Sequence, residues 1–251
     1  MTGHRPTART PVQALVAVMV AVALAGTAPA HAEDDIESLS AQQISDRAKE
    51  AMLSATSVHI STEGDLRPAG STSELDLTMD RDGNCAGTVS TGAKGSVEII
   101  KRGDTVWMKP DELFWKSQVP GAGEQAAELF KDRYLRGSTK DSMLKSMADV
   151  CDLDRLLNSI ADSPDMKVPL TKGGTTKIDG VDVITVTGKR EGRTTTMYVA
   201  TEGEPYPVRL ETTAGSAKAS ITLSAYDEPV PSATPPADKS VDISRVSEQE
   251  N

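Results

Sequence analysis

Aromatic residues are scarce in this sequence. Two Trp, four Tyr and two Phe make up 3% of 251 residues, and all of them lie beyond residue 106. A broad platform of stacked rings, as used to bind sugars or single-stranded nucleic acid, is therefore disfavoured. The chain also has few basic residues relative to acidic ones, 27 against 37, and a net charge of −10. This balance disfavours nucleic acid as a partner, because phosphate backbones are bound by clusters of basic side chains.

Groups that could carry catalysis are equally scarce. The three histidines are His4, His31 and His59, and only His59 lies beyond the first 32 residues. The sequence places His59 on the polar face of an expected strand, and no G-x-S-x-G serine elbow accompanies it, so no hydrolase triad is assigned. One imidazole and two distant cysteines do not make a zinc site. We therefore expect a protein that is not an enzyme and that holds no metal or cofactor.

Residues 1–32 have the pattern of a secretory signal peptide. Arg5 and Arg9 precede an uncharged apolar run of about a dozen residues, shorter than the roughly 20 that span a bilayer. Small residues at Ala30 and Ala32 suit cleavage after Ala32, and no cysteine stands near that point to receive a lipid. The sequence predicts a secreted, extracytoplasmic protein of the cell envelope without a stable membrane anchor after cleavage. An uncleaved N-terminal anchor is the alternative.

Two cysteines, Cys85 and Cys151, remain after that cleavage. An even number of cysteines in an oxidising compartment usually indicates disulfide bonds. We therefore expect a bond between Cys85 and Cys151. Two buried thiols are the alternative, because the sequence does not show that the two residues lie close together.

Hydrophobic patterning predicts one α+β domain over residues 33–228. A capping box at Ser40–Gln43 begins a helix expected over 41–55. Alternation of apolar and polar residues then predicts strands at 57–66, 74–80, 85–89, 96–102 and 105–109. Helical spacing follows at 124–134, 142–150 and 152–160, and strand character returns at 181–187, 194–199, 207–212 and 218–226. Residues 229–251 are expected to form a Pro-rich extended tail.

Several stretches carry a family resemblance in their order along the chain. They are Ser57–Gly64, Asp82–Val89, Gly103–Pro110 with Phe114–Lys116, and Tyr226–Val230 with Pro235–Asp238. In these stretches the chain resembles the actinobacterial LppX/LprG-type lipoproteins, which are related in fold to the lipoprotein carrier LolA. The resemblance implies a curved antiparallel half-barrel with short helices packed across its concave face. It also implies a hydrophobic cavity that holds acyl chains of lipids or glycolipids, whereas the lipobox cysteine of those lipoproteins is missing here.

The apolar faces of the expected strands and helices are the candidate walls of such a cavity. The candidate residues are Val58, Ile60, Leu75, Leu77, Met79, Val106, Met108, Phe130, Met143 and Leu156. A cavity formed by these side chains would bind or carry a lipid, a glycolipid or a lipopeptide. The same side chains could instead pack as a filled core. The protein would then be an interaction or regulatory module of the cell envelope, with a protein partner that the sequence does not name.

Overall fold

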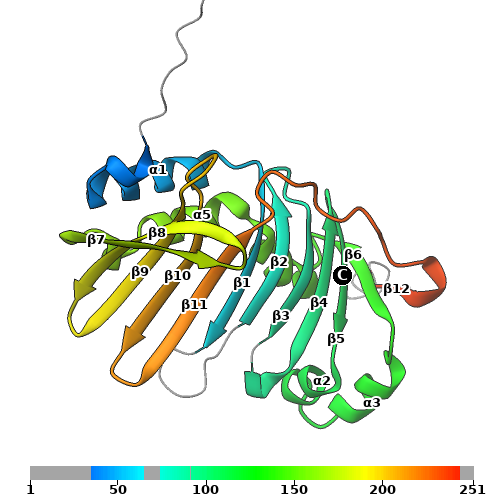
Figure 1. Ribbon diagram of the computed structural model, residues 1–251. Coiled ribbons are helices and arrows are strands. Elements are labelled where there is room, and N and C mark those ends of the chain that lie inside the picture. Colours follow the sequence, from blue (N-terminus) through cyan, green and yellow to red (C-terminus); the bar gives the residue numbers. More distant parts are fainter. Residues whose placement is uncertain (1–34, 65–73, 91, 244–251) are drawn as a thin grey trace, which may run out of the picture. The chain divides into compact units, whose positions relative to one another are not determined.

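One open sheet organises the described part of the chain, residues 35–64, 74–90 and 92–243 (Figure 1). The expected signal peptide lies outside these residues. Twelve strands follow the order β12-β6-β5-β4-β3-β2-β1-β11-β10-β9-β8-β7, and their neighbours are antiparallel except for β12 and β6. The strands are β1 Ser57–Gly64, β2 Glu74–Asp80, β3 Cys85–Ser90, β4 Ser96–Arg102, β5 Thr105–Pro110, β6 Tyr134–Ser138, β7 Leu170–Ile178, β8 Val181–Arg190, β9 Arg193–Ala200, β10 Pro207–Ala214, β11 Ala217–Ser224 and β12 Ser240–Asp242.

Two meanders of strands meet in the middle of this sheet. Strands β1 to β6 run outward on one side and β7 to β11 run inward from the other, so that β1 pairs with β11. In this pairing His59 lies opposite Ser224 and Ile60 opposite Leu223. The expected α+β fold, an antiparallel sheet with short helices, is therefore confirmed, and the sheet remains open with β12 and β7 at its edges.

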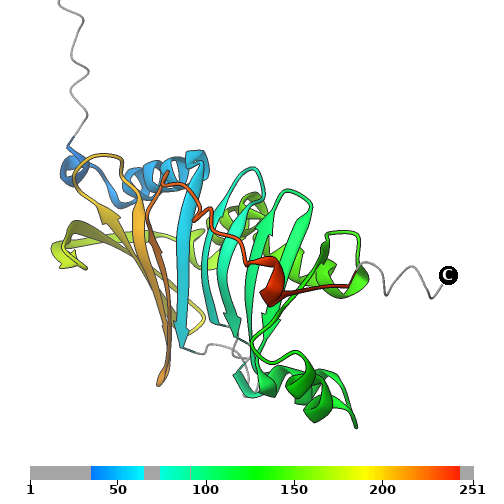
Figure 2. The ribbon, with the colours of Figure 1, turned by 90° about the vertical axis from the view of Figure 1, so that its right-hand side faces the viewer.

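Helices lie at the ends of the strands and against the core-facing side of the sheet. They are α1 Ala41–Ser54, α2 Glu112–Gln118, α3 Gly123–Leu129, α4 Ser142–Ala148 and α5 Leu153–Ala161. Figures 1 and 2 place α1 at one end of the strands and the α2–α3 pair at the opposite end. The expected capping box is present, because the Ser40 hydroxyl accepts from the Gln43 N–H while the Gln43 side chain accepts from the Ser40 N–H. Within the described residues, no helix has the length and apolar character needed to cross a membrane.

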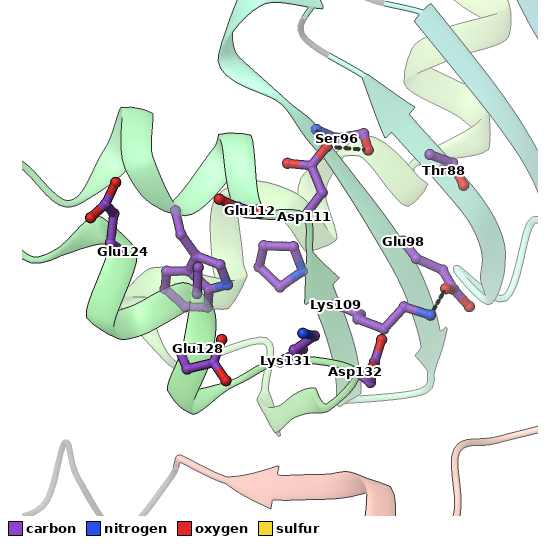
Figure 3. Close-up of a pocket in the computed structure, with 13 residues that line it drawn as sticks. Thr88, Ser96, Glu98, Lys109, Asp111, Glu112, Glu124, Glu128, Lys131 and Asp132 are labelled. Atoms are coloured by element: carbon purple, nitrogen blue, oxygen red, sulfur yellow. Dashed lines mark hydrogen bonds and ion pairs between the residues drawn. The ribbon is translucent and has the colours of Figure 1, made fainter.

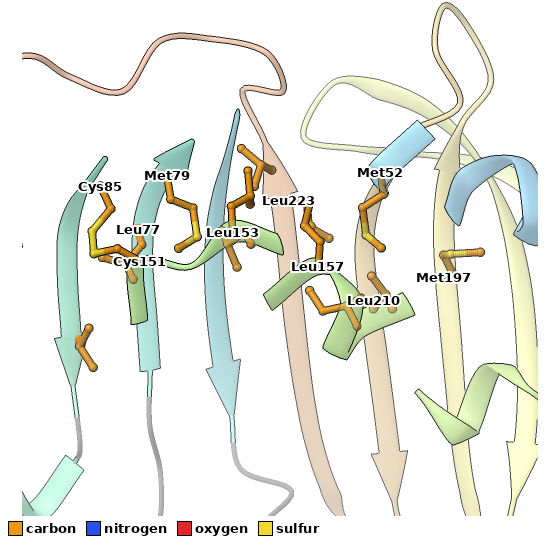
Figure 4. Close-up of a cluster of buried hydrophobic side chains, with 14 of the residues drawn as sticks. Met52, Leu77, Met79, Cys85, Cys151, Leu153, Leu157, Met197, Leu210 and Leu223 are labelled. Atoms are coloured by element: carbon orange, nitrogen blue, oxygen red, sulfur yellow. A yellow bond between two sulfur atoms is a disulfide. The ribbon is translucent and has the colours of Figure 1, made fainter. Parts of the chain in front are cut away.

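The hydrophobic core lies between the sheet and the helices α1, α4 and α5. Alternate residues of each strand face it, as the period of two requires, so that Ile60 and Leu77 are buried while His59 lies on the other face. Figure 4 shows Leu153 and Leu157 of α5 on the side of the sheet that carries Leu77 and Met79. The expected disulfide joins Cys85 of β3 to Cys151, directly before α5, with a Cα–Cα distance of 5.6 Å.

The structure corrects two expected boundaries. The helix expected over 124–134 ends with α3 at Leu129, and β6 begins at Tyr134. Asp132 lies between them with φ of 56°, a conformation that does not continue a helix. In the segment expected as a tail, Ser240–Asp242 forms β12 and pairs with β6, so the sheet continues beyond residue 228.

Candidate functional site

The residues predicted to line a cavity lie in the packed core. Six of them have at most 1% of their surface exposed: Val58, Ile60, Leu77, Met79, Val106 and Met108. Leu75, Phe130 and Leu156 are partly buried against the same core. The side chain of Met143 lies outside the described part of the structure, although its backbone belongs to α4. None of these nine side chains lines either of the two pockets described below.

An apolar pocket of about 410 Å³ lies between α1, α5 and the strands β9 and β10. This volume falls within the range of roughly 300–1,000 Å³ that is typical of small-molecule sites. Nine apolar residues line the pocket: Met52, Ile160, Ala161, Met166, Val168, Pro169, Met197, Pro207 and Leu210. Gln42, Ser45, Asp46, Lys49 and Lys167 complete the lining. We call this space the apolar pocket.

The apolar pocket is continuous with the core. Met52 of α1, Ile160 of α5, Met197 of β9 and Leu210 of β10 are each at least nine-tenths buried and belong to the same cluster of side chains as Leu77. Three of the lining residues are methionines, whose flexible thioether chains adapt to irregular surfaces. The pocket is therefore a place where the core opens toward the surface between α1 and α5.

Two lysines at the rim of the apolar pocket share one carboxylate. Lys167 Nζ lies 3.1 Å from Oδ1 of Asp162, and Lys49 Nζ lies 4.0 Å from the same oxygen. The hydrogen bond from Lys167, with the charge of Lys49, holds the pKa of Asp162 below its ordinary value. Asp46 is the acid among the lining residues, and its Oδ1 accepts a hydrogen bond of 2.9 Å from Gln42 Nε2.

A second pocket, of about 460 Å³, lies beside α2 and α3 at the other end of the sheet (Figure 3). We call it the charged pocket, because six carboxylates and two lysines are among its lining residues. These are Glu98, Asp111, Glu112, Glu124, Glu128, Asp132, Lys109 and Lys131. Trp115, Thr88, Ser96, Pro110 and Ala127 complete the lining.

Several charges of the charged pocket hold the local structure together. Asp111 caps α2 by accepting from the Phe114 N–H at 2.7 Å and binds Ser96 with its other oxygen. Lys109 Nζ lies 2.5 Å from Glu98, which also accepts from the Tyr134 hydroxyl. Burial alone would raise the pKa of Glu98, but these two partners outweigh it, so that its pKa lies below the ordinary value.

His59, the one histidine beyond the expected signal peptide, lies outside both pockets. His59 Nδ1 is 3.1 Å from the Thr78 hydroxyl, and its Nε2 is 3.7 Å from Asp76. All three side chains lie on the polar face of β1 and β2, as the sequence predicts for His59. Among the described residues, no group of three or more His, Cys, Asp or Glu side chains is placed to hold a metal ion.

Comparison with known proteins identifies the fold. No protein-family model matches the chain, and no curated protein matches its sequence. The crystal structure of LprF from Mycobacterium bovis is 17% identical, with a TM-score of 0.53, and the match covers 78% of this chain and 96% of that one. The lipoprotein LppX from Mycobacterium tuberculosis is 19% identical with a TM-score of 0.46, covering 76% and 97%. The likeness to LprF confirms the fold that the sequence resemblance implies.

Proposed function

We propose that this protein is a non-catalytic, exported binder or carrier of a hydrophobic ligand, and that the apolar pocket receives the ligand's hydrocarbon chain. The observation that carries the proposal is a lining of nine apolar side chains together with five polar ones. Apolar walls with a few polar groups are the usual composition of a small-molecule site. The sequence resemblance supports a lipid, a glycolipid or a lipopeptide as the ligand class.

The dimensions of the apolar pocket favour one chain of the ligand over several. About 410 Å³ lies near the lower end of the range for ligand sites. The ten residues expected from the sequence remain proposed deeper walls of the cavity. The nine whose side chains are described are linked to the pocket by the shared core cluster, in which Met52 and Leu210 belong to the same packed region as Leu77. A longer chain would have to enter by displacing adaptable side chains such as Met52 and Met197.

A second candidate function rests on the packing of the same strand residues. Val58, Leu77 and Val106 have no exposed surface, which is the state expected of a filled core. With a core closed in this way, the fold would act as an interaction or regulatory module of the cell envelope. The two candidates differ in one measurable property, because only the first binds an apolar probe saturably.

The test is titration with N-phenyl-1-naphthylamine, a neutral apolar molecule that fluoresces when removed from water. We expect saturable binding to the wild-type protein and a loss of at least about tenfold in affinity for Ala161→Trp, because the indole fills the apolar pocket. Ala127→Trp is the matched control, since Ala127 is a partly buried helical alanine that lines the charged pocket. It should leave binding unchanged.

Each outcome of the titration decides between the candidates. Absence of saturable binding by the wild type would favour the closed-core module. Equal binding by Ala161→Trp and wild type would remove the apolar pocket as the site. Thermal unfolding of each variant verifies that the altered protein is folded, so that a loss of binding is not a loss of structure.

Export is the part of the proposal that rests on residues 1–32. It predicts that N-terminal sequencing of protein recovered from outside the cytoplasm begins at Glu33. Recovery of membrane-bound protein with Arg5 and Arg9 still present would contradict cleavage and support an N-terminal anchor.

A further inference from the structure

We infer that the rim of the apolar pocket selects an anionic head group, so that the preferred ligand is a single-chain amphiphile ending in a carboxylate. This inference rests on the proposed function, because it assigns the head of the ligand whose chain enters the pocket. It depends on the placement of Lys49, Lys167 and Asp162 around the mouth.

The charge of the rim differs from that of the chain as a whole. The protein carries a net charge of −10, yet the charged residues that line the apolar pocket are two lysines and one aspartate. That aspartate, Asp46, already accepts a hydrogen bond from Gln42. An approaching anion therefore meets two lysines whose shared partner, Asp162, lies outside the pocket lining, although the protein as a whole is acidic.

The two lysines come from separate segments and converge on one point. Lys49 belongs to α1, and Lys167 follows the short 3-10 helix Pro164–Met166. Both ammonium groups lie within 4.0 Å of the same oxygen, Oδ1 of Asp162. An anion at that position receives two cationic donors at once, and the lysines are held there by different elements of the fold.

Asp162 occupies the position that a ligand carboxylate would take. Its side chain is two-thirds exposed and is not part of the pocket lining, so its ion pairs are surface pairs of small net strength. A ligand whose chain is buried among Met52, Met166 and Met197 adds hydrophobic free energy that Asp162 does not have. The ligand carboxylate can therefore displace Asp162 from the lysines.

The experiment compares decanoate with decanol, two single-chain compounds that differ in the charge of the head. Each is titrated against the wild-type protein by calorimetry and by displacement of N-phenyl-1-naphthylamine. We expect decanoate to bind about tenfold more tightly than decanol at neutral pH, because charge-assisted hydrogen bonds form only with the carboxylate. The preference should fall as the salt concentration rises.

Three variants assign this preference to the rim. The double substitution Lys49→Met and Lys167→Met keeps the apolar stems and should remove the preference while decanol binding stays unchanged. Asp162→Asn should strengthen decanoate binding severalfold, because the competing carboxylate is gone. Lys116→Met is the control, since Lys116 pairs with Glu112 and Glu124 at the other end of the sheet and should have no effect.

The outcomes separate the head-group inference from the proposed function. If decanoate and decanol bind equally to the wild type, or if the double variant keeps the preference, the inference is overturned while hydrophobic binding stands. If calorimetry detects neither compound and the probe does not bind, both are overturned. If the double variant loses the preference for decanoate over decanol while the Lys116→Met control keeps it, the head-group inference and the proposed function are both supported.

Discussion

The apolar pocket and the charged pocket are similar in volume, about 410 and 460 Å³, and both are walled by helices on one side and strands on the other. Their linings differ. The first presents nine apolar side chains, whereas the second presents eight charged ones. The comparison shows that volume alone does not identify a ligand site, because what matters is whether the lining atoms already have partners.

In the charged pocket, several of the charged side chains have partners within the protein. Asp111 caps α2, and Glu98 joins β4 to β5 and β6 through Lys109 and Tyr134. In the apolar pocket, the side chains of Met166, Val168 and their neighbours face open volume, and burial of apolar surface is the interaction that remains available to them. The charged pocket therefore stabilises the α2–α3 end of the fold, while the apolar pocket is the proposed ligand site.

The largest expected effect separates the packed core from the pocket wall. Leu77→Gln should lower the free energy of unfolding by about 3–5 kcal/mol, because Leu77 is fully buried and the amide would lack partners. Met197→Gln should lower the free energy of unfolding by about 1 kcal/mol. Position 197 lines the apolar pocket, so the amide of the new glutamine can reach water there. Urea unfolding measures both. Equal losses would show that the pocket wall is as closed as the core.

Removal of the disulfide should have the next largest effect on the free energy of unfolding, and it should destabilise some elements more than others. The bond closes a loop between residues 66 positions apart, so replacing both Cys85 and Cys151 by alanine should cost up to about 4 kcal/mol in the chain-entropy description. Cys151 directly precedes α5, which forms part of the wall of the apolar pocket. Neither cysteine of the disulfide belongs to α2 or α3. Hydrogen exchange should therefore accelerate more in α5 than in α2. Uniform acceleration would mean that the two ends of the sheet unfold as one unit.

Most of the fold could be predicted from the sequence for those strands that have one face against the core and the other toward solvent. The alternation in β1 and β2 places Ile60 and Leu77 inside and His59 outside, because a half-buried strand requires a period of two. Strand β7 has no such signal, since its residues are largely exposed along the edge of the sheet. The start of strand β6 is not predicted, because the helical spacing of apolar side chains continues through residues 124–134, although α3 ends at Leu129.

The site was harder to predict than the fold. The spacing of apolar residues indicates which side chains face the core. It does not indicate where the packed side chains leave an unfilled space. The apolar pocket is built from single residues of distant segments, such as Met52, Ile160, Met197 and Leu210. One local signal was present in the sequence. The stretch Met166–Pro169, between α5 and β7, places one charged residue, Lys167, among apolar ones, and all four residues line the pocket.

The smallest expected effect concerns the charged pocket. Glu98→Gln should lower the free energy of unfolding by about 0.5–1 kcal/mol, because the ion pair with Lys109 is one-third exposed on both sides and is screened by solvent. Binding of N-phenyl-1-naphthylamine should not change, since Glu98 lies far along the sheet from β9 and β10. A change in probe affinity would show that the two pockets are coupled through the sheet.

The pH dependence of this small effect identifies its cause. The folded protein holds the pKa of Glu98 below its ordinary value, so the carboxylate contributes stability above the pKa of the unfolded chain and loses that contribution as the pH falls through the lower, folded value. The difference in stability between wild type and Glu98→Gln should therefore be full near neutral pH and diminish below about pH 4. A difference in stability between wild type and Glu98→Gln that persists at pH 2 would assign the effect to packing around Tyr134 rather than to the charge of Glu98. The two pockets would then differ in shape and not in how their charges are paired.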